Sequence, residues 1–277
     1  MDHVNVNRNS ASQRLTSLLK TCATVASDPV IALDYALYRL GRNAATSSFG
    51  ARLEGATYSE LRTIRNLALG PREQALISSL PSQGVFFDVG AHVGIWTSAL
   101  AMAHPGATVH AFEASPETFR TLNRNIEKNN ITNAILNQTA VSDESGFLQF
   151  QAPRNGSVFG RIHADGNSQH RFDNAAIVDV PALRLADYCR THGIGNIDFL
   201  KIDVEGAEIR VLRGILSHIP VGRMWIEIDE RNLADMGHSI AEMAYIVTGA
   251  GYRFVLSDGS ETDIRAHHEG NMLILPR

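Results

Sequence analysis

The chain has 277 residues, of which 44% are hydrophobic, and its formal net charge at pH 7 is −4. This length and composition predict a folded chain with a sizeable core, and the slight negative charge lacks the basic footprint typical of nucleic-acid-binding proteins. The two cysteines, Cys22 and Cys189, have no metal-ligand spacing, so they indicate neither a disulfide framework nor a zinc site.

Residues 1–83 contain helical patterns and no membrane or export segment. The N-terminus lacks the apolar stretch of a signal peptide, and no apolar run approaches the ~20 residues that cross a bilayer. We therefore expect a soluble, cytoplasmic protein. Leucines recur at helical spacing around residues 15–19 and 61–69, before a break at Gly70 and Pro71. These patterns predict a helical accessory segment, with contacts to substrate or to a second copy in a homo-oligomer.

Residues 84–277 alternate short apolar strands with amphipathic helices. Such alternation predicts an α/β domain whose parallel sheet is covered by helices on both faces. Ser115 before Pro116, and Ser239 with Glu242, indicate helix N-termini. The expected strands are 85–90, 108–114, 134–141, 197–203, 223–229, 252–257 and 271–276, and the expected helices are 94–103, 116–130, 207–216 and one after Ser239.

The first chemical motif lies where the first of these strands meets a helix, and it reads DVGAHVG, residues 88–94. Glycines let the backbone approach a ligand, and a helix N-terminus offers unpaired N–H groups, which favours a nucleotide-type ligand. Gly90 and Gly94 are spaced as GxxxG because His92 takes the middle position, so the dinucleotide fingerprint GxGxxG is incomplete. Tight strand-to-helix packing is the alternative explanation for these glycines.

An acidic residue at the end of the next strand strengthens the nucleotide interpretation. Glu113 follows the glycines by about 20 residues, the separation at which a carboxylate accepts hydrogen bonds from both ribose hydroxyls of a bound adenosine. The alternative is that Glu113 stabilises the N-terminus of the helix that begins after Ser115.

Three charged residues lie where the strand 197–203 meets the next helix: Lys201, Asp203 and Glu205. Strand alternation puts them on one side, near the carboxyl end of the sheet, where ligands bind in open α/β folds. Asp203 and Glu205 are therefore expected to border the same crevice as the glycine loop. Alternatively, Glu205 and Glu208 complement the helix N-terminus while Lys201 neutralises Asp203.

Five segments carry a resemblance to a known family: DVGAHVG, AFEASPETFRTLNRNIEKNN, TAVSDESGFLQF, IDFLKIDVEGAEIRVLRG and MWIEID. Over roughly residues 57–229 they resemble the FkbM-type family of S-adenosylmethionine-dependent methyltransferases. The resemblance implies a class I methyltransferase fold, a doubly wound, Rossmann-like sheet of seven strands with an antiparallel last strand. It also implies methyl transfer, commonly to a hydroxyl of a sugar, a glycan or a secondary metabolite.

The resemblance also implies roles for single residues. His92 belongs to the candidate cofactor-binding loop but stands where many relatives have asparagine, so its side chain either contacts the cofactor or shapes the turn. The residues carried over by position are Asp88, Gly90, Ala91 and Gly94 for the cofactor loop, Glu113 for the ribose, Ser142 and Asp143 for the adenine side, and Asp203 and Glu205 for the acidic strand end.

Methyl transfer to a hydroxyl requires a base for the hydroxyl proton, with the acceptor held about 3 Å from the methyl group. Asp203 is the first candidate for this base, and Glu205 either assists or orients it; Glu227 and Glu230, after the next strand, are fallbacks. These carboxylates could instead hold a magnesium ion that acidifies the acceptor, and the sequence does not separate the two roles. Further base candidates on loops are His163, His170, His267 and His268.

Two other functions share this class of fold. A nicotinamide-dependent (NAD) dehydrogenase is disfavoured by the GxxxG spacing and by the absence of a Tyr-x-x-x-Lys pair. An inactive cofactor-binding module is disfavoured by the intact set of loop and strand-end residues. Loops 153–175 and 258–270 are polar and are expected at the mouth of the site, where they would suit a small-molecule or glycan acceptor rich in hydroxyls.

Overall fold

The computed structural model describes residues 35, 38–66, 69–153, 161–162, 175–256 and 258–277. The chain divides into two compact units, Met1–Asn43 and Ala44–Arg277. The leucine pattern around residues 15–19 lies outside the described residues. All elements discussed below belong to the larger unit.

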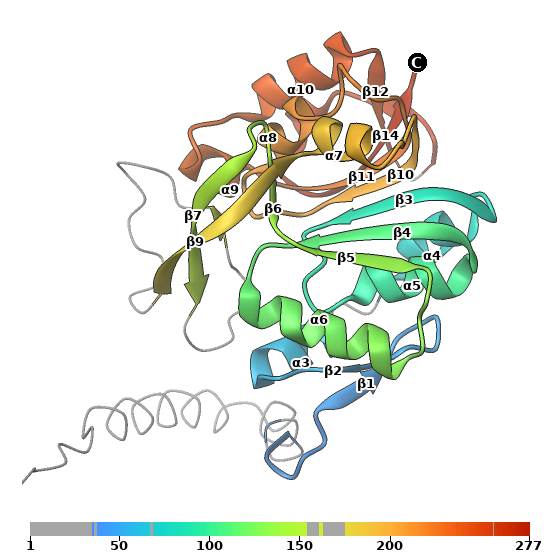
Figure 1. Ribbon diagram of the computed structural model, residues 1–277. Coiled ribbons are helices and arrows are strands. Elements are labelled where there is room, and N and C mark those ends of the chain that lie inside the picture. The colour runs from blue at the N-terminus through green and yellow to red at the C-terminus, as the bar shows by residue number, and fades with distance from the viewer. Residues whose placement is uncertain (1–34, 36–37, 67–68, 154–160, 163–174, 257) are drawn as a thin grey trace, which may run out of the picture. The chain divides into compact units, whose positions relative to one another are not determined.

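One sheet of eight strands forms the centre of the larger unit (Figure 1). Its strand order is β13-β12-β14-β11-β10-β3-β4-β5, and β14 runs antiparallel to both of its neighbours. The chain winds outward in both directions from the neighbouring strands β3 and β10, which makes their carboxyl ends the expected ligand site. The strands are β3 (Gln83–Val89), β4 (Gly106–Glu113), β5 (Ala134–Gln138), β10 (Ile197–Ile202), β11 (Val221–Asp229), β12 (Tyr252–Val255), β13 (Glu261–Thr262) and β14 (Glu269–Pro276).

This topology confirms the predicted doubly wound α/β sheet with an antiparallel last strand. The strand count differs by one, because the two-residue strand β13 pairs with β12 at the edge of the sheet. So short a strand leaves no alternation in the sequence from which it could be recognised.

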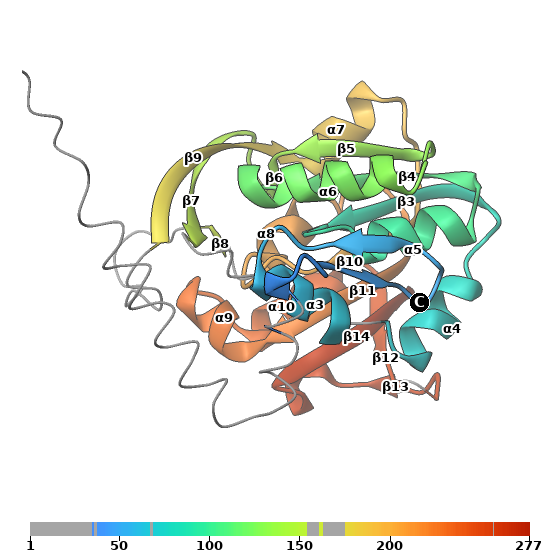
Figure 2. The same cartoon turned by 90° about the horizontal axis from the view of Figure 1, so that it is seen from below.

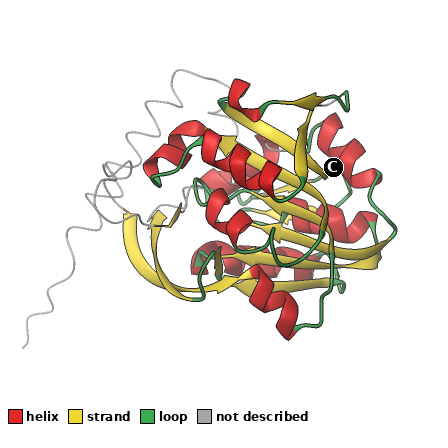
Figure 3. Cartoon of the chain, turned by 90° about the horizontal axis from the view of Figure 1, so that it is seen from above, coloured by secondary structure: helices red, strands yellow, loops and turns green. Residues whose placement is uncertain are grey.

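Helices cover both faces of the sheet, which Figure 1 shows from the side and Figure 3 from above. Successive strand residues point to opposite faces, so Phe86 packs in one apolar cluster and Phe87 in the other. One face carries α4 (Pro71–Ser78), α5 (Ile95–Ala103) and α6 (Pro116–Lys128), and the other carries α7 (Leu185–Thr191), α8 (Glu208–Arg213) and α10 (Ile240–Gly249).

The expected helix N-termini are confirmed by their capping bonds. The hydroxyl of Ser115 accepts a hydrogen bond from Thr118 N at 3.3 Å, and that of Ser239 accepts one from Glu242 N at 3.2 Å. Pro116 occupies the first turn of α6, where no backbone N–H is needed. These two helices therefore begin where the sequence placed them.

Residues 44–83 are not wholly helical, contrary to expectation. They form a hairpin of β1 (Ala44–Thr46) and β2 (Arg52–Glu54), followed by α3 (Tyr58–Asn66) and α4. The compact unit includes these residues together with the sheet. The substrate or dimer contacts expected of residues 1–83 stay predictions.

Two asparagines, one in α6 and one directly after it, satisfy the backbone of β2, which lies beside that helix (Figure 2). Asn125 accepts from Glu54 N at 2.8 Å and donates to Glu54 O at 3.0 Å, and Asn129 makes the same pair of bonds with Arg52. A carboxamide carries both a donor and an acceptor, so each asparagine replaces a neighbouring strand. This pairing connects the start of the compact unit to the central fold.

A second sheet, in the order β6-β9-β7-β8, was not predicted. The expected strand 134–141 is divided at Thr139, after which β6 leaves the main sheet and pairs in parallel with β9. Its strands are β6 (Ala140–Ser142), β7 (Gly146–Pro153), β8 (Arg161–Ile162) and β9 (Ala175–Arg184). Most of the polar segment 154–174 lies outside the described residues.

Within the part of the chain that the structure describes, no helix combines the length and hydropathy needed to cross a membrane. The cytoplasmic location stays a prediction.

Candidate active site

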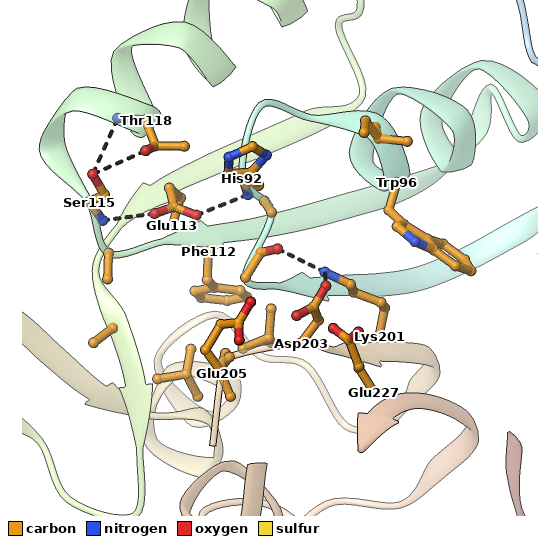
Figure 4. Close-up of a pocket in the computed structure, with 18 of the residues that line it drawn as sticks. His92, Trp96, Phe112, Glu113, Ser115, Thr118, Lys201, Asp203, Glu205 and Glu227 are labelled. Carbon is orange, nitrogen blue, oxygen red and sulfur yellow. Dashed lines mark hydrogen bonds and ion pairs between the residues drawn. The ribbon is translucent and has the colours of Figure 1, made fainter. Parts of the chain in front are cut away.

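A cavity of about 510 Å³ opens at the carboxyl ends of the central strands (Figure 4). The loops after β3, β4 and β10 border it, and α3 contributes further lining residues. It therefore lies where the strand order reverses, as expected for a ligand site in an open α/β sheet. Of the predicted site residues, Gly90, Ala91, His92, Glu113, Asp203 and Glu205 line the cavity, whereas Asp88, Gly94, Ser142 and Asp143 do not.

The glycine loop is built for close packing of the backbone. Gly90 has a φ of +78°, and a Cβ atom on it would lie 1.7 Å from the carbonyl oxygen of Asp203. The N–H groups of Gly90 and Ala91 both donate to Phe112 O, at 3.0 and 2.9 Å. The close approach of the strand end that carries Asp203 thus requires glycine at position 90, and the Gly90 N–H is already paired within the protein.

Gly94 also has a packing role. Its φ is +96°, and a Cβ atom there would lie 2.8 Å from Leu122 Cδ1 of α6. A side chain at this position would displace the end of the Leu122 side chain, and the positive φ would strain any residue other than glycine. Packing and backbone conformation thus both favour glycine here, and the cofactor role implied for Gly94 stays a prediction.

Glu113 ties the glycine loop to the start of α6. Its Oε2 accepts from His92 N at 2.9 Å, and its Oε1 accepts from Ser115 N at 2.8 Å (Figure 4). Burial of the carboxyl, against the opposing effect of these two bonds, raises its pKa to about 7. His92 has a φ of +50°, and burial lowers its pKa to about 4, so its ring is neutral at neutral pH.

Asp88 is fully buried and does not line the cavity. Its Oδ2 accepts from the Thr97 hydroxyl at 2.6 Å, and its Oδ1 lies 3.4 Å from Lys201 Nζ. Asp88 thus positions Lys201. Ser142 is also buried, and its hydroxyl donates to Asp143 Oδ1 at 3.0 Å. The cofactor contacts implied for Asp88, Ser142 and Asp143 stay predictions.

Lys201 connects the glycine loop to the acidic strand end. Its Nζ donates to Gly90 O at 2.8 Å and lies 3.4 Å from Asp203 Oδ2 (Figure 4). Burial alone would lower the pKa of Lys201, but Asp203 and Asp88 outweigh it and raise that pKa to about 12. Lys201 is therefore a buried, permanent cation, and the pairing with Asp203 expected from the sequence is confirmed.

Asp203 and Glu227 form a carboxyl pair on adjacent parallel strand ends. Although burial opposes it, the charge of Lys201 lowers the pKa of Asp203 below its ordinary value. The negative charge of Asp203, followed by burial, raises the pKa of Glu227 well above its ordinary value. At neutral pH the pair therefore holds one proton, and it resides on Glu227.

Glu205 and Glu208 shape the loop that follows β10. Glu205 has a φ of +53°, and its Oε2 accepts from Asn232 Nδ2 at 2.8 Å. Glu208 Oε1 accepts from the backbone N–H groups of Val204 and Gly206, at 3.2 and 3.1 Å. Glu208 thus holds the loop that carries Asp203, which is more specific than the general helix-terminus role raised from the sequence.

The buried carboxyl of Glu208 should make stability depend on pH. Burial raises its pKa from 4.5 to about 7, so its contribution is complete below about pH 4.5 and lost as pH rises through 7. Glu208→Gln keeps an acceptor for both N–H groups without titrating. We expect the stability of the wild type relative to this variant to fall by on the order of 3 kcal/mol between about pH 4.5 and 8.

Urea unfolding of both proteins at several pH values measures this difference, and Glu208→Ala serves as a matched variant that lacks the acceptor. A stability difference that stays constant with pH would show that the Glu208 carboxyl is not perturbed.

Several residues that line the cavity were not among the leading site candidates predicted from the sequence. Ser59, Arg62 and Thr63 come from α3, and Trp96 comes from α5. Glu227, a fallback candidate, lines the cavity. No local motif marks these residues, because only the tertiary fold brings α3 to the carboxyl edge of the sheet.

The other base candidates that the structure describes, Glu230, His267 and His268, do not line the cavity. The Nδ1–H of His268 donates to Glu230 Oε2 at 2.8 Å, and Nε2 of His267 lies 3.1 Å from the Thr262 hydroxyl oxygen. The described part of loop 258–270 contributes no lining residue, whereas Ile162 from segment 153–175 does. His163 and His170 lie outside the described residues.

No group of three or more His, Cys, Asp or Glu side chains among the described residues is arranged to hold a metal ion. The magnesium alternative therefore has no support from this part of the chain.

Comparison with known proteins identifies the family. Residues 88–254 match the family model described as the methyltransferase FkbM domain. The chain belongs to the FkbM methyltransferase family. This match covers the glycine loop, Glu113 and the acidic strand end, and it supports methyl transfer over the dehydrogenase alternative.

Individual methyltransferases are similar over half or more of the chain. The 31-O-demethyl-FK506 methyltransferase FkbM of Streptomyces tacrolimicus is 28% identical, over 62% of this chain and 73% of that one. Methyltransferase sdnD of Sordaria araneosa is 30% identical, over 50% and 63%. The hexuronic acid methyltransferase AglP of Haloferax volcanii is 26% identical, over 68% and 73%. The chain thus spans about two thirds to three quarters of the length of these relatives.

Proposed function

We propose that this FkbM-family protein is an S-adenosylmethionine-dependent O-methyltransferase that acts on a hydroxyl of a sugar, a glycan or a secondary metabolite. The observation that carries the proposal is the presence of Asp203, paired with Lys201, in the same cavity as Glu113. The Asp203 carboxylate is suited to take a hydroxyl proton, and the Glu113 carboxylate is suited to bind a ribose. A nucleoside cofactor and an acceptor would therefore meet in one space.

The cavity lining fits the chemistry of S-adenosylmethionine. Each oxygen of Glu113 accepts one backbone N–H, which leaves a further lone pair on each for the ribose hydroxyls. Val89, Phe112 and Val141 offer apolar surface for an adenine ring, and the acidic groups complement sulfonium and ammonium charges. When bound, S-adenosylmethionine would supply an electrophilic methyl group.

Asp203 is the proposed base. Lys201 keeps its carboxylate ionised, so Asp203 can accept the hydroxyl proton of the acceptor. The bound cofactor would supply the methyl group, whose bond to sulfur would break as the bond to the hydroxyl oxygen forms. Glu227 carries the proton of the pair and can donate a hydrogen bond to the acceptor. Glu205, bonded to Asn232, is proposed to orient the acceptor or Asp203.

A polyhydroxyl acceptor suits the lining. Ser59, Thr63 and the acidic pair offer hydrogen-bonding groups in the cavity lining, and Trp96 offers an aromatic surface for the apolar face of a ring. The relative from Haloferax volcanii is named a hexuronic acid methyltransferase, which supports the same class of acceptor.

Incubation with methyl-labelled S-adenosylmethionine and cell extracts, fractionated into glycan, lipid and small-molecule pools, tests this function. Label should enter the glycan or small-molecule pool as a methyl ether, which survives mild alkali, and Asp203→Asn should slow its incorporation by about 10² to 10⁴. Parallel reactions with EDTA, then with added magnesium, test whether a metal is required. Transfer only to amines or as alkali-labile esters would contradict O-methylation of a hydroxyl.

A further inference from the structure

One face of α3 enters the cavity. Ser59, Arg62 and Thr63 follow the i, i+3, i+4 spacing that places side chains on the same side of a helix, and all three line the cavity. Leu61 and Ile64, on the opposite side, are buried in the core. The helix is therefore fixed by its apolar face, and Arg62 is held at the cavity wall.

The charges around the cavity leave Arg62 without an internal partner. The lining contains two permanent cations, Arg62 and Lys201, and four acidic groups, Glu113, Asp203, Glu205 and Glu227. Lys201 is engaged by Asp88, Asp203 and the carbonyl oxygen of Gly90. Among the described residues, Arg62 has neither a hydrogen-bond acceptor nor an ion-pair partner, although it is half-buried.

We propose that Arg62 is the carboxylate-binding residue of this cavity. The inference rests on the proposed function, which puts two ligands here, and either can carry a carboxylate: the amino-acid end of the cofactor or an acidic sugar acceptor. A guanidinium matches a carboxylate with two parallel N–H donors, and Arg62 is the cation of the lining that remains available for this contact.

Arg62 and the acidic residues of the cavity suit chemically different parts of a ligand. Glu113, Asp203, Glu205 and Glu227 complement cations and hydroxyls, and the ionised carboxylate of Asp203 repels a second carboxylate. A ligand that carries both an ammonium and a carboxylate group needs an acidic side chain near the ammonium and a basic side chain near the carboxylate. Arg62 supplies the positive position on the α3 side of the cavity.

Calorimetry with two cofactor fragments tests the proposal. S-adenosylhomocysteine keeps the amino-acid carboxylate, whereas 5′-methylthioadenosine lacks the whole amino-acid end. If the cofactor is the ligand of Arg62, Arg62→Gln should weaken S-adenosylhomocysteine binding by about 10- to 100-fold and leave 5′-methylthioadenosine binding unchanged. Arg62→Lys, which keeps the charge but loses the two-pronged contact, should recover part of the affinity.

A second experiment tests the acceptor as the ligand, and it uses the protein loaded with S-adenosylhomocysteine. If an acidic acceptor is the ligand, wild type should bind D-glucuronate in preference to D-glucose in saturation-transfer NMR, and Arg62→Gln should lose this preference with cofactor affinity unchanged. Arg120→Gln, which removes an exposed arginine of α6 outside the cavity lining, is the matched control and should behave as wild type.

Two results would overturn the proposal while leaving the function intact. In the first, Arg62→Gln matches the wild type with all four ligands. In the second, it loses both cofactor fragments equally, which would make Arg62 a contact to the nucleoside or a shaping residue. Failure of the wild type to bind S-adenosylhomocysteine at all would instead refute the proposed function, and this inference with it.

Discussion

Replacing Asp203 with Asn is expected to lower turnover on the true acceptor by about 10² to 10⁴ while leaving S-adenosylmethionine affinity nearly unchanged. Asparagine keeps the shape of the side chain but cannot take the hydroxyl proton. Lys201 retains Asp88 as a charged partner 3.4 Å away, so the loop should keep its geometry. Steady-state kinetics and calorimetry on the same preparation measure the two effects.

The neighbouring acid gives a matched control. Glu227 holds the proton of the carboxyl pair, so Glu227→Gln replaces one neutral side chain with another and should cost much less turnover than Asp203→Asn. Because Lys201 lowers the pKa of Asp203, the capacity of Asp203 to take the hydroxyl proton should be lost as pH falls through that lowered pKa, below its ordinary value of 3.8. Equal losses of turnover and cofactor affinity in Asp203→Asn would make Asp203 a cofactor ligand and not the base.

Gly90→Ala is expected to abolish cofactor binding and to destabilise the protein by on the order of 3 kcal/mol. The new Cβ atom would lie 1.7 Å from the carbonyl oxygen of Asp203. Only a movement of the backbone at the acidic strand end can relieve this clash. The φ of +78° adds strain for any side chain. Urea unfolding and calorimetry give the two quantities.

Gly237→Ala separates the effect of the steric clash from the strain of the positive φ. Gly237 has nearly the same φ, +76°, but a Cβ atom there meets nothing within 4 Å. The excess destabilisation of Gly90→Ala over Gly237→Ala therefore measures the steric clash alone. If both variants lose the same stability and Gly90→Ala still binds the cofactor, the close approach to Asp203 does not constrain the site.

The sequence predicted the central sheet because its strands are short, apolar and separated by clear helix starts. Ser115 and Ser239 cap helices where expected, and the antiparallel β14 follows β12 as the resemblance implied. The cavity residues after β3, β4 and β10 were also predicted, because parallel strands place their carboxyl ends along one edge of the sheet.

What sequence reasoning missed depends on contacts between distant segments. Arg62 reaches the cavity through the packing of α3, and the hairpin β1-β2 is completed by asparagines more than seventy positions later. The glycine at position 90 was assigned to ligand approach, whereas its nearest neighbour is the backbone of Asp203, 113 positions away in sequence. The local pattern of apolar and polar residues does not indicate contacts between segments so far apart in the sequence.

The most direct test of the proposed function is a calorimetric titration of the wild type and of Glu113→Ala with S-adenosylmethionine and with NAD. Wild type should bind S-adenosylmethionine and not NAD, and Glu113→Ala should weaken that binding by about 1.5 to 3 kcal/mol because it loses the ribose contacts. Binding of NAD without any response to S-adenosylmethionine, or a folded Glu113→Ala variant with unchanged affinity, would contradict it.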